Sequence, residues 1–523
     1  MKLFIYKTPF SDKNYMLVDQ GIIKSVSQVL PTSLPSDIEI FDFNNDYVYP
    51  SFNDTHMHFI GYGTYLNRCQ LEHTHSISDL QNKLTAYMRA HLPEQLIGRG
   101  WNQDEFDEQR LPSRHDLDLV SKNIPIILYR ACGHMAVVNT AALETFGITS
   151  STQVDGGEID LEDGEPTGIL RENALSLVQI PITLKDLKQD ILRAQKKLNA
   201  YGITSVQTDD LIMVEQERHH DLIQLFQEMA EKRELTVRVY EQSQFFTAEN
   251  LERQVNLGYQ LNKGNDLFRM GPVKILADGS LGARTAKLKK PYVDDASAQG
   301  ILIHSEEEID TLIDIAFKND LDVAIHGIGD YTIQMAIDKI NHHQSRYKRL
   351  KHRNSIVHSQ IMDQPLIDLM AQSYVHALVQ PVFLEYDMTI VEKRVGAELA
   401  QTSYAYKTMQ EAGIILGFGS DAPVEDPNPF RSIYYAVYRQ RPDGTSYYPE
   451  EGISVTSALE CFTSKAAFFS YEEHIKGKLE PGYYADFIVL SKPIETATPE
   501  ELLNMKIKAT YLGGQCVHQA ITG

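Results

Sequence analysis

The chain has 523 residues, of which 42% are hydrophobic and 23% charged, and its formal net charge is −22. This length and composition predict a large folded core with more than one simple domain and argue against a disordered chain. A strongly acidic protein repels phosphate backbones, so nucleic acid is excluded as an expected partner.

The N-terminal segment does not have the pattern of a secretion signal. Lys7, Asp12 and Lys13 interrupt the stretch where a signal peptide needs an apolar core. No run approaches the roughly 18 uninterrupted apolar residues of a membrane span. The four cysteines form no CxxC pair and no disulfide framework, which suits a reducing compartment; they are Cys69, Cys132, Cys461 and Cys516. We therefore expect a cytoplasmic protein with no membrane partner.

Both ends of the chain have the composition of short strands separated by turns. The expected strands cover residues 3–6, 15–18 and 22–26 near the start and residues 485–490 and 509–512 near the end. Because these β-rich ends flank a different middle, we expect them to pair into a small β-sandwich domain formed by residues 1–50 and 478–523.

The middle of the chain alternates short apolar runs with amphipathic segments. Expected strands cover residues 203–207, 236–240, 273–276, 323–326, 355–358, 377–380 and 415–417, with helices at 307–319, 331–342 and 364–372 among the segments between them. This alternation predicts an α/β fold with a parallel sheet covered by helices. With a further strand ending near His56 there are eight strands, which favours a closed (β/α)₈ TIM barrel over residues 51–68 and 173–477.

Residues 69–172 are far too many for an ordinary loop after the first barrel strand. They contain the only tryptophan, Trp101, and glycine-rich turns at residues 155–157 and 163–164. We expect this insertion to form a separate lobe over the mouth of the barrel.

Metal-capable side chains recur at the ends of the expected strands. His56 and His58 are two residues apart, so on a strand they point to the same side. His326, His358 and Asp421 each end or follow a later strand. Active sites of such barrels lie at the carboxyl ends of the strands, and imidazole is a common zinc ligand. A second HxH pair, His73 and His75, lies in a polar context, and we interpret it as unrelated to the site.

The ordered motifs resemble the amidohydrolase superfamily, and within it the YtcJ-like subgroup, over nearly the whole chain. The similar segments are PSFNDTHMH, GRGWNQ, ACGHMAVVN, GEPTGILREN, VKILADGSLGARTA, HGIGD, IVHSQ, GFGSDAPVE and LEPGYYADFIVL. One departure is Ser51, where the superfamily usually has glycine.

The resemblance implies a role for each matching residue. His56, His58, His326 and His358 match metal ligands, and Asp421 matches an aspartate that binds metal and accepts a proton from the attacking water. Lys274 matches a lysine that is often carboxylated and bridges two metals. The implied cofactor is a divalent metal, one or two zinc ions. The chemistry is coherent without the family, since a metal makes water acidic and a nearby carboxylate can move its proton.

Burial gives an independent reason to expect a modified Lys274. This residue lies in the apolar run 272–277. Desolvation disfavours an ammonium ion, and a neutral amine can react with carbon dioxide to give an anionic carbamate. The alternative is an unmodified amine that pairs with Asp278 or Glu172 beside a single metal. In that case Glu172 is the substitute bridging ligand.

Several other residues are candidates for substrate binding. Asp278 and Arg284 lie in a glycine-punctuated loop after the strand that carries Lys274, where Arg284 either clamps a substrate oxygen or is a solvated residue of a turn. His134 and Asn139 resemble a motif that reaches over the site, and the alternative is ordinary packing of the lobe. Trp101 either lines the pocket or lies in a core.

The function we expect is hydrolysis of an amide-type carbon–nitrogen bond in a small molecule. A cyclic imide or a formamide is plausible chemistry, because the subgroup includes a deformylase of N-substituted formamides. Three alternatives stay open: a hydrolase of an ester or lactone, a deaminase of the same superfamily, and a regulatory or binding protein that kept the fold. A binding protein has no need of Asp421 as a base. A homo-oligomer is also possible.

Overall fold

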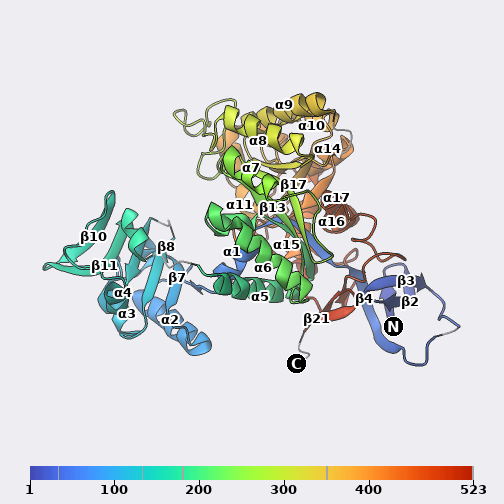
Figure 1. Cartoon of the computed structure of the whole chain (residues 1–523), viewed down its shortest axis with the longest axis horizontal. Coiled ribbons are helices and arrows are strands. Elements are labelled where there is room, and N and C mark those ends of the chain that lie inside the picture. Colours follow the sequence, from blue (N-terminus) through green and yellow to red (C-terminus); the bar gives the residue numbers. More distant parts are fainter. Residues whose placement is uncertain (33, 132–133, 179–181, 349–351, 521–523) are drawn as a thin grey trace. The chain divides into compact units, whose positions relative to one another are not determined.

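The computed structural model describes residues 1–32, 34–131, 134–178, 182–348 and 352–520, so Cys132 lies outside the described residues. The chain forms two compact units, one made of Met1–Tyr62 and Ile191–Gly523 and the other of Gly63–Asp190 (Figure 1). The inserted unit is thus wider at both ends than the expected range 69–172. The other unit holds both the barrel and the sheet made from the chain ends.

The larger unit is built around eight parallel strands in a single sheet. Their order is β18-β17-β16-β15-β14-β13-β12-β5, so each strand of the barrel pairs with its neighbour along the chain. The strands are β5 (Phe52–Met57), β12 (Ile203–Thr208), β13 (Arg238–Gln244), β14 (Phe268–Leu276), β15 (Val323–Gly327), β16 (Ser355–His358), β17 (His376–Val379) and β18 (Leu416–Phe418). This topology confirms the predicted barrel.

The first and last strands meet beyond their carboxyl ends. The amide of Asp421 donates to the carbonyl of His56 at 2.8 Å, and the amide of His58 donates to the carbonyl of Ala422 at 2.8 Å. The buried carboxylate of Asp54 accepts from the amide of Ser420 at 3.1 Å and from its hydroxyl at 2.6 Å. The segment after β18 is therefore fixed against β5 at the place where the histidines lie.

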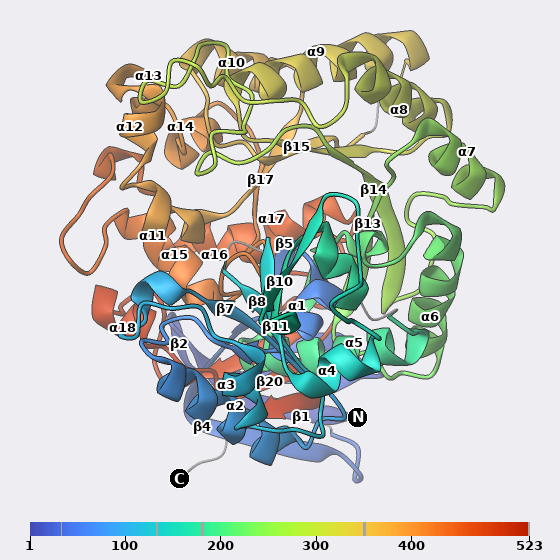
Figure 2. The same cartoon turned by 90° about the vertical axis from the view of Figure 1, so that its left-hand side faces the viewer.

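Helices form an outer layer around the strands, as Figure 2 shows for α6 to α10. The helix α8 (Glu306–Lys318) illustrates why they form: Ser305 and Glu308 make a capping box at its start, and Ile309, Leu312 and Ile313 are buried along one side. The other helices of eight or more residues in this layer are α5 (Leu184–Ala200), α6 (His219–Glu231), α7 (Ala248–Asn256), α9 (Asp330–Tyr347), α10 (Gln364–Gln372), α15 (Pro429–Tyr438) and α16 (Val455–Phe462). Shorter helices are α11 (Leu384–Asp387), α12 (Val391–Val395), α13 (Ala397–Gln401), α14 (Tyr406–Glu411) and α17 (Ser464–Phe469).

The two ends of the chain pair into one seven-stranded sheet. Its strands in order are β21 (Gln515–Gln519), β20 (Ala509–Leu512), β19 (Phe487–Leu490), β4 (Glu39–Pro50), β1 (Lys2–Thr8), β2 (Ser11–Asp19) and β3 (Ile22–Ser27). Phe4, Phe487 and Tyr511 pack in its core, with Phe4 5.0 Å from Phe487 between ring centroids. The pairing of both ends in one sheet is as expected, and the two-layer sandwich stays a prediction.

A buried ion pair joins this sheet to the barrel. Arg238, at the start of β13, donates to the Asp486 carboxylate at 2.7 Å and 3.0 Å, and Asp486 also accepts from the amide of Gly513 at 2.7 Å. The guanidinium lies over the Tyr484 ring, 3.7 Å from its centroid. Each side-chain nitrogen and oxygen of this bidentate pair has a hydrogen-bond partner, so the pair can be buried between two elements.

The inserted unit has a six-stranded sheet of its own. The strands in order are β10 (Gly157–Glu162), β11 (Glu165–Glu172), β9 (Met135–Val138), β8 (Ile126–Arg130), β7 (Leu96–Trp101) and β6 (Cys69–Gln70), with helices α2 (Ile77–His91), α3 (Arg114–Asp118) and α4 (Thr140–Thr145). Two apolar clusters fill it, one of them around Trp101. It is therefore a lobe with its own core, and its place over the barrel mouth stays a prediction.

Among the described residues, no helix is both long and apolar enough to cross a membrane. The three cysteines that the structure describes, Cys69, Cys461 and Cys516, are free thiols.

Candidate metal centre

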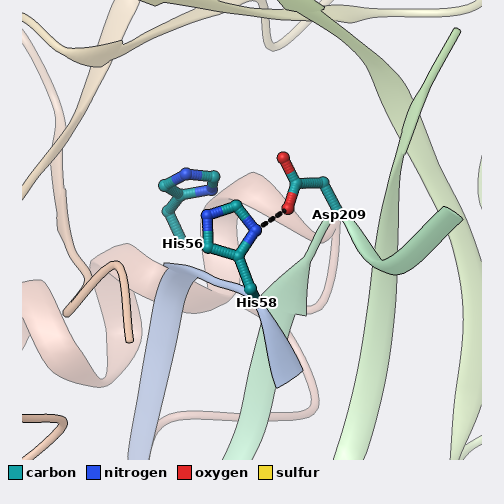
Figure 3. Close-up of side chains that lie close together, drawn as sticks. All are labelled: His56, His58 and Asp209. Atoms are coloured by element: carbon teal, nitrogen blue, oxygen red, sulfur yellow. Dashed lines mark ion pairs between the residues drawn. The ribbon is translucent and has the colours of Figure 1, made fainter. Parts of the chain in front are cut away.

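The HxH pair ends the first barrel strand. His56 lies within β5 and His58 directly follows it, and their rings lie 5.6 Å apart between centroids. His56 is 1% exposed, and His58 is half-buried. Both side chains point to the same region at the carboxyl end of the barrel, as the two-residue period of a strand requires (Figure 3).

Asp421 lies close to the same two histidines, on the segment after β18 that is hydrogen-bonded to β5. Its Oδ1 lies 3.1 Å from His58 Nε2 and 3.5 Å from His56 Nε2. The backbone of Asp421 has φ +59°, a left-handed conformation that is uncommon for a residue with a side chain. Such strained backbone is often found at functional sites, and here the closure bonds to β5 stabilise it.

His326 and His358 lie at the carboxyl ends of the adjacent strands β15 and β16. Their ring centroids are 4.5 Å apart, and the ring of His358 lies 5.7 Å from that of His56. His358 also has a left-handed backbone, with φ +77°. The Nε2 atom of His326 lies 3.2 Å from the carbonyl oxygen of Gly279, which can only accept a hydrogen bond. His326 therefore carries its proton on Nε2 and has its lone pair on Nδ1.

Lys274 extends from β14 into the middle of this group. It is 2% exposed, and its Nζ lies 3.2 Å from His56 Nε2 and 3.3 Å from Asp209 Oδ2. The structure thus brings together all six residues that the sequence assigned to the metal centre, at the carboxyl ends of β5, β14, β15, β16 and β18.

Asp209 is a member of the centre that the sequence analysis missed. It directly follows β12, is buried, and has its Oδ1 2.5 Å from His58 Nδ1 (Figure 3). The signal was present, because the acid pair Asp209-Asp210 comes just after the expected strand 203–207 and strand ends were the criterion for the other ligands. Asp209 meets that criterion, which we applied only to His326, His358 and Asp421 among the later strands.

Burial and neighbouring charges shift the pKa values of these groups strongly. Burial, with the Lys274 charge, lowers the pKa of His56 to about 3. Burial and the same lysine lower the pKa of His326 to about 4, and burial beside His326 lowers that of His358 well below the usual value. Neutral imidazoles are the form that binds metals.

The two carboxylates of the centre stay ionised for a different reason. Burial opposes their charge, but His58 and His56 outweigh it at Asp421 and hold the pKa of that carboxyl below its ordinary value. His58 and Lys274 do the same to the pKa of Asp209. Against its own burial, His58 between these carboxylates has its pKa raised well above the usual value. The centre therefore combines anionic oxygens with imidazole nitrogens.

Several buried atoms of the centre suit a divalent cation. His58 Nδ1, Asp209 Oδ1 and Asp421 Oδ1 have no hydrogen-bond partner within the described part of the chain. Two overlapping sets each bring three ligand atoms within 4.8 Å of one another, namely His56, His58 and Asp209, and His56, His358 and Asp421. Nitrogen and carboxylate oxygen are the ligands that zinc and similar metals take.

The two candidates in the loop after β14 have partners within the barrel unit. The Asp278 carboxylate accepts from the amides of Ile328 at 3.1 Å and Gly329 at 2.9 Å, and its Oδ1 lies 3.4 Å from His326 Nε2. Arg284 donates to Asp294 at 3.1 Å and 2.9 Å. Asp278 thus fixes the segment after β15, and a substrate contact of either residue stays a prediction.

The remaining candidates belong to the inserted lobe. Trp101 is fully buried and donates its indole N–H to the carbonyl of Leu128 at 2.9 Å. Asn139 is fully buried as the N-cap of α4. His134 and Glu172 are exposed and pair with each other at 3.1 Å. Within the lobe, Trp101 and Asn139 support the fold, and the roles of all four toward a substrate or metal stay predictions.

The second HxH pair, His73 and His75, is exposed in the lobe. Neither belongs to the groups of described residues that could hold a metal. Sequence spacing alone therefore does not make a site.

The chain is similar to a known family and to several individual proteins. A family model described as "Amidohydrolase family" matches residues 39–518. YtcJ of Bacillus subtilis is 31% identical over 96% of this chain and 95% of its own length. LONG AFTER FAR-RED 3 of Arabidopsis thaliana is 30% identical over 90% and 82%, and the N-substituted formamide deformylase of Arthrobacter pascens is 26% identical over 94% and 92%.

Solved structures agree with these matches. A metal-dependent hydrolase from Pyrococcus furiosus is 28% identical, with 94% of this chain and 99% of the other covered and a TM-score of 0.76. A second metal-dependent hydrolase, from Pyrococcus horikoshii OT3, is 27% identical, with 95% and 99% covered and a TM-score of 0.78.

Proposed function

The chain belongs to the amidohydrolase family and is a metal-dependent hydrolase, and we propose that it cleaves an amide-type carbon–nitrogen bond in a small molecule. Membership confirms the resemblance that the sequence motifs carried. The observation that carries the proposal is the cluster of buried and half-buried side chains at the carboxyl end of the barrel, namely His56, His58, His326, His358 and Asp421.

A divalent metal, for which we propose zinc, would be held by these residues. When bound, such an ion supplies Lewis acidity, which makes water acidic near neutral pH and polarises a carbonyl group. His56, His326 and His358 would contribute nitrogen lone pairs, and His58 would contribute one once it has released its proton. Asp421 and Asp209 would contribute negative charge. The buried surroundings keep these interactions strong because little water competes with them.

Asp421 has the position and ionisation state of a proton acceptor. Its Oδ1 is buried without a hydrogen-bond partner among the described residues and lies 3.1 Å from His58 Nε2. In the proposed reaction, Oδ1 takes a proton from the attacking water and gives it to the nitrogen of the leaving amine as the carbon–nitrogen bond breaks. Such proton transfer is the step that makes a poor amine leaving group depart.

We also propose that Lys274 carries a carbamate in the active protein. The amine at Nζ forms a bond to the carbon of carbon dioxide and loses a proton, which gives an anion with two oxygens. The position supports this step: Nζ is buried 3.2 Å from His56 Nε2, where an ammonium would repel a metal cation. Growth with ¹³C-labelled carbon dioxide should give a carbamate carbon resonance that Lys274→Met lacks, and its absence from the metal-loaded wild type would refute the modification.

The choice of a carbon–nitrogen bond draws support from a relative. The Arthrobacter pascens protein, matched over 94% of this chain, is named as a deformylase of N-substituted formamides. An N-substituted formamide has a small acyl group and an amine that needs a proton to leave, which suits a site with one buried carboxylate base.

The test is hydrolysis by the metal-loaded chain of a panel of N-substituted formamides, cyclic imides, lactones, esters and amino-heterocycles. We expect release of an amine together with formate or another acid from at least one amide-type member. Turnover confined to esters or lactones, or release of ammonia from the heterocycles alone, would refute the proposed bond. No turnover of any member by a chain that holds its metal would favour a binding or regulatory role.

A further inference from the structure

Two buried glutamines contact two of the metal-centre histidines in the same way. Gln242 Oε1, on β13, lies 3.1 Å from His56 Nδ1, and Gln380 Oε1, just after β17, lies 2.7 Å from His358 Nδ1. Gln242 is fully buried and Gln380 is 2% exposed. Neither glutamine was singled out by sequence pattern, and neither is needed as a ligand.

The backbone decides which way each amide faces. Gln242 Nε2 donates to the carbonyl of Thr55 at 3.1 Å, and Gln380 Nε2 donates to the carbonyl of Leu378 at 3.1 Å. A backbone carbonyl can only accept, so each amide nitrogen must face it, and each amide oxygen must then face the histidine. The reverse orientation would place an oxygen against a carbonyl oxygen and leave buried polar groups unpaired.

The orientation of the amides in turn decides where the histidine protons are. The amide oxygen also can only accept, so Nδ1 of His56 and of His358 must carry the proton. A neutral imidazole then has its lone pair on Nε2. For His56 this nitrogen lies 3.5 Å from Asp421 Oδ1, inside the metal centre.

We propose that Gln242 and Gln380 are positioning residues that hold His56 and His358 as the Nδ1–H tautomer, with the Nε2 lone pairs directed at the metal. This inference rests on the proposed role of both histidines as ligands. Each glutamine amide hydrogen-bonds to a backbone carbonyl through its nitrogen and to an imidazole through its oxygen. Because the rings are fixed before a metal arrives, binding does not have to reorganise them.

Removing the acceptor should weaken metal binding without removing any ligand. Partners of this kind typically contribute about 10–100-fold to metal affinity. We expect Gln242→Met and Gln380→Met each to raise the Kd for zinc by about that factor in chelator competition on the full chain. Methionine has a similar length to glutamine and leaves Nδ1 without an acceptor.

Two further variants separate positioning from general damage to the fold. Gln207 is also a buried barrel glutamine, and it donates to the carbonyl of Ala466 at 3.0 Å. Among the described residues, no hydrogen bond joins Gln207 to any of these histidines. Gln207→Met should leave the Kd within about twofold of wild type. Gln380→Glu should restore affinity relative to Gln380→Met, because a carboxyl oxygen again accepts from His358 Nδ1.

The tautomer itself can be read without metal or substrate. In the metal-free chain labelled with ¹⁵N-histidine, long-range ¹H–¹⁵N correlation should show His56 and His358 as Nδ1–H. Gln242→Met should change the pattern of His56 alone, and Gln380→Met that of His358 alone. An unchanged tautomer in both variants, or a Gln207→Met variant that loses as much affinity, would overturn the proposal. Failure of the wild type to bind zinc would instead overturn the proposed function, whatever the tautomers are.

Discussion

Replacing Asp421 by asparagine tests the proton transfer separately from the fold. Asparagine has nearly the same shape as aspartate and keeps an oxygen toward the histidines, but it cannot accept a proton at neutral pH. The carboxylate lies 3.1 Å from His58 Nε2 and 3.5 Å from His56 Nε2, and its backbone bonds to β5 do not involve the side chain. The change therefore removes one charge and one base and leaves no backbone bond broken.

The expected loss follows from the step that Asp421 carries. General acid–base catalysis contributes about 10²–10⁴-fold, which corresponds to about 2.7–5.4 kcal/mol of the activation barrier. We expect kcat of metal-loaded Asp421→Asn on the fastest amide substrate to fall by about 10² or more, with metal content measured on the same sample. The matched control is Asp322→Asn, a buried aspartate directly before β15, at the opposite end of the barrel. Its kcat should stay within about threefold of wild type, since catalysis lies at the carboxyl ends of the strands. Near-normal turnover by metal-loaded Asp421→Asn would refute the role of the carboxylate.

Three further predictions concern stability. Arg238→Met should lower the Tm strongly, because it leaves the Asp486 carboxylate buried without its partner. Such a change typically costs about 3–5 kcal/mol. An unchanged Tm would show that the pair does not join the sheet to the barrel. Trp101→Ala should lower the stability of the inserted lobe by about 3–5 kcal/mol, because it removes a side chain from the core of the lobe. Hydrogen exchange should show faster amide exchange confined to residues 63–190. No change in that exchange would contradict the assigned core. Burial raises the pKa of Asp387 from 3.8 to about 6 in the folded chain. Between about pH 4 and 6 the unfolded chain therefore releases a proton that the folded chain keeps. The free energy of unfolding then falls by up to about 3 kcal/mol as the pH rises. Asp387→Asn should flatten that part of the stability curve measured by thermal denaturation, and an identical curve would disprove the assignment.

The barrel and its metal residues could be predicted because one physical rule connects them. Strands β12, β15 and β16 were expected within a residue or two of where they lie, since continuous apolar runs are typical of a buried parallel sheet. Carboxyl ends of such strands meet at one end of the barrel, so residues that end different strands must come together. His56, His326, His358 and Asp421 are far apart in sequence and close in space for this reason.

The residues around the ligands could not be found by the same reasoning. The expected strand 236–240 stopped before Glu241, because the polar run Glu241 to Gln244 does not look like a buried strand, yet β13 continues to Gln244 with every residue buried. Polar side chains can be buried in a site because they hydrogen-bond to one another there. Their stretch of sequence therefore lacks the apolar pattern that predicts a buried strand. Gln242 is one of these side chains, and it hydrogen-bonds to His56, which lies 186 positions away in sequence.

The lobe shows a similar limit. Trp101 ends β7 and belongs to an apolar cluster whose members lie up to 68 positions away in sequence, as Ile169 does. A single tryptophan in a glycine-rich segment gave no indication of whether its neighbours would be a substrate or a core. The fully buried indole with its N–H bound to Leu128 identifies it as a core residue of the lobe.

The most direct test of the account is the metal content of the purified full chain after replacing one HxH pair or the other. Elemental analysis should find at least one transition metal ion per wild-type chain. The double variant His56→Ala/His58→Ala should lose that metal, while His73→Ala/His75→Ala, which removes the exposed pair in the lobe, should keep it. Full retention of metal without His56 and His58 would contradict the central claim that the carboxyl end of this barrel holds the metal.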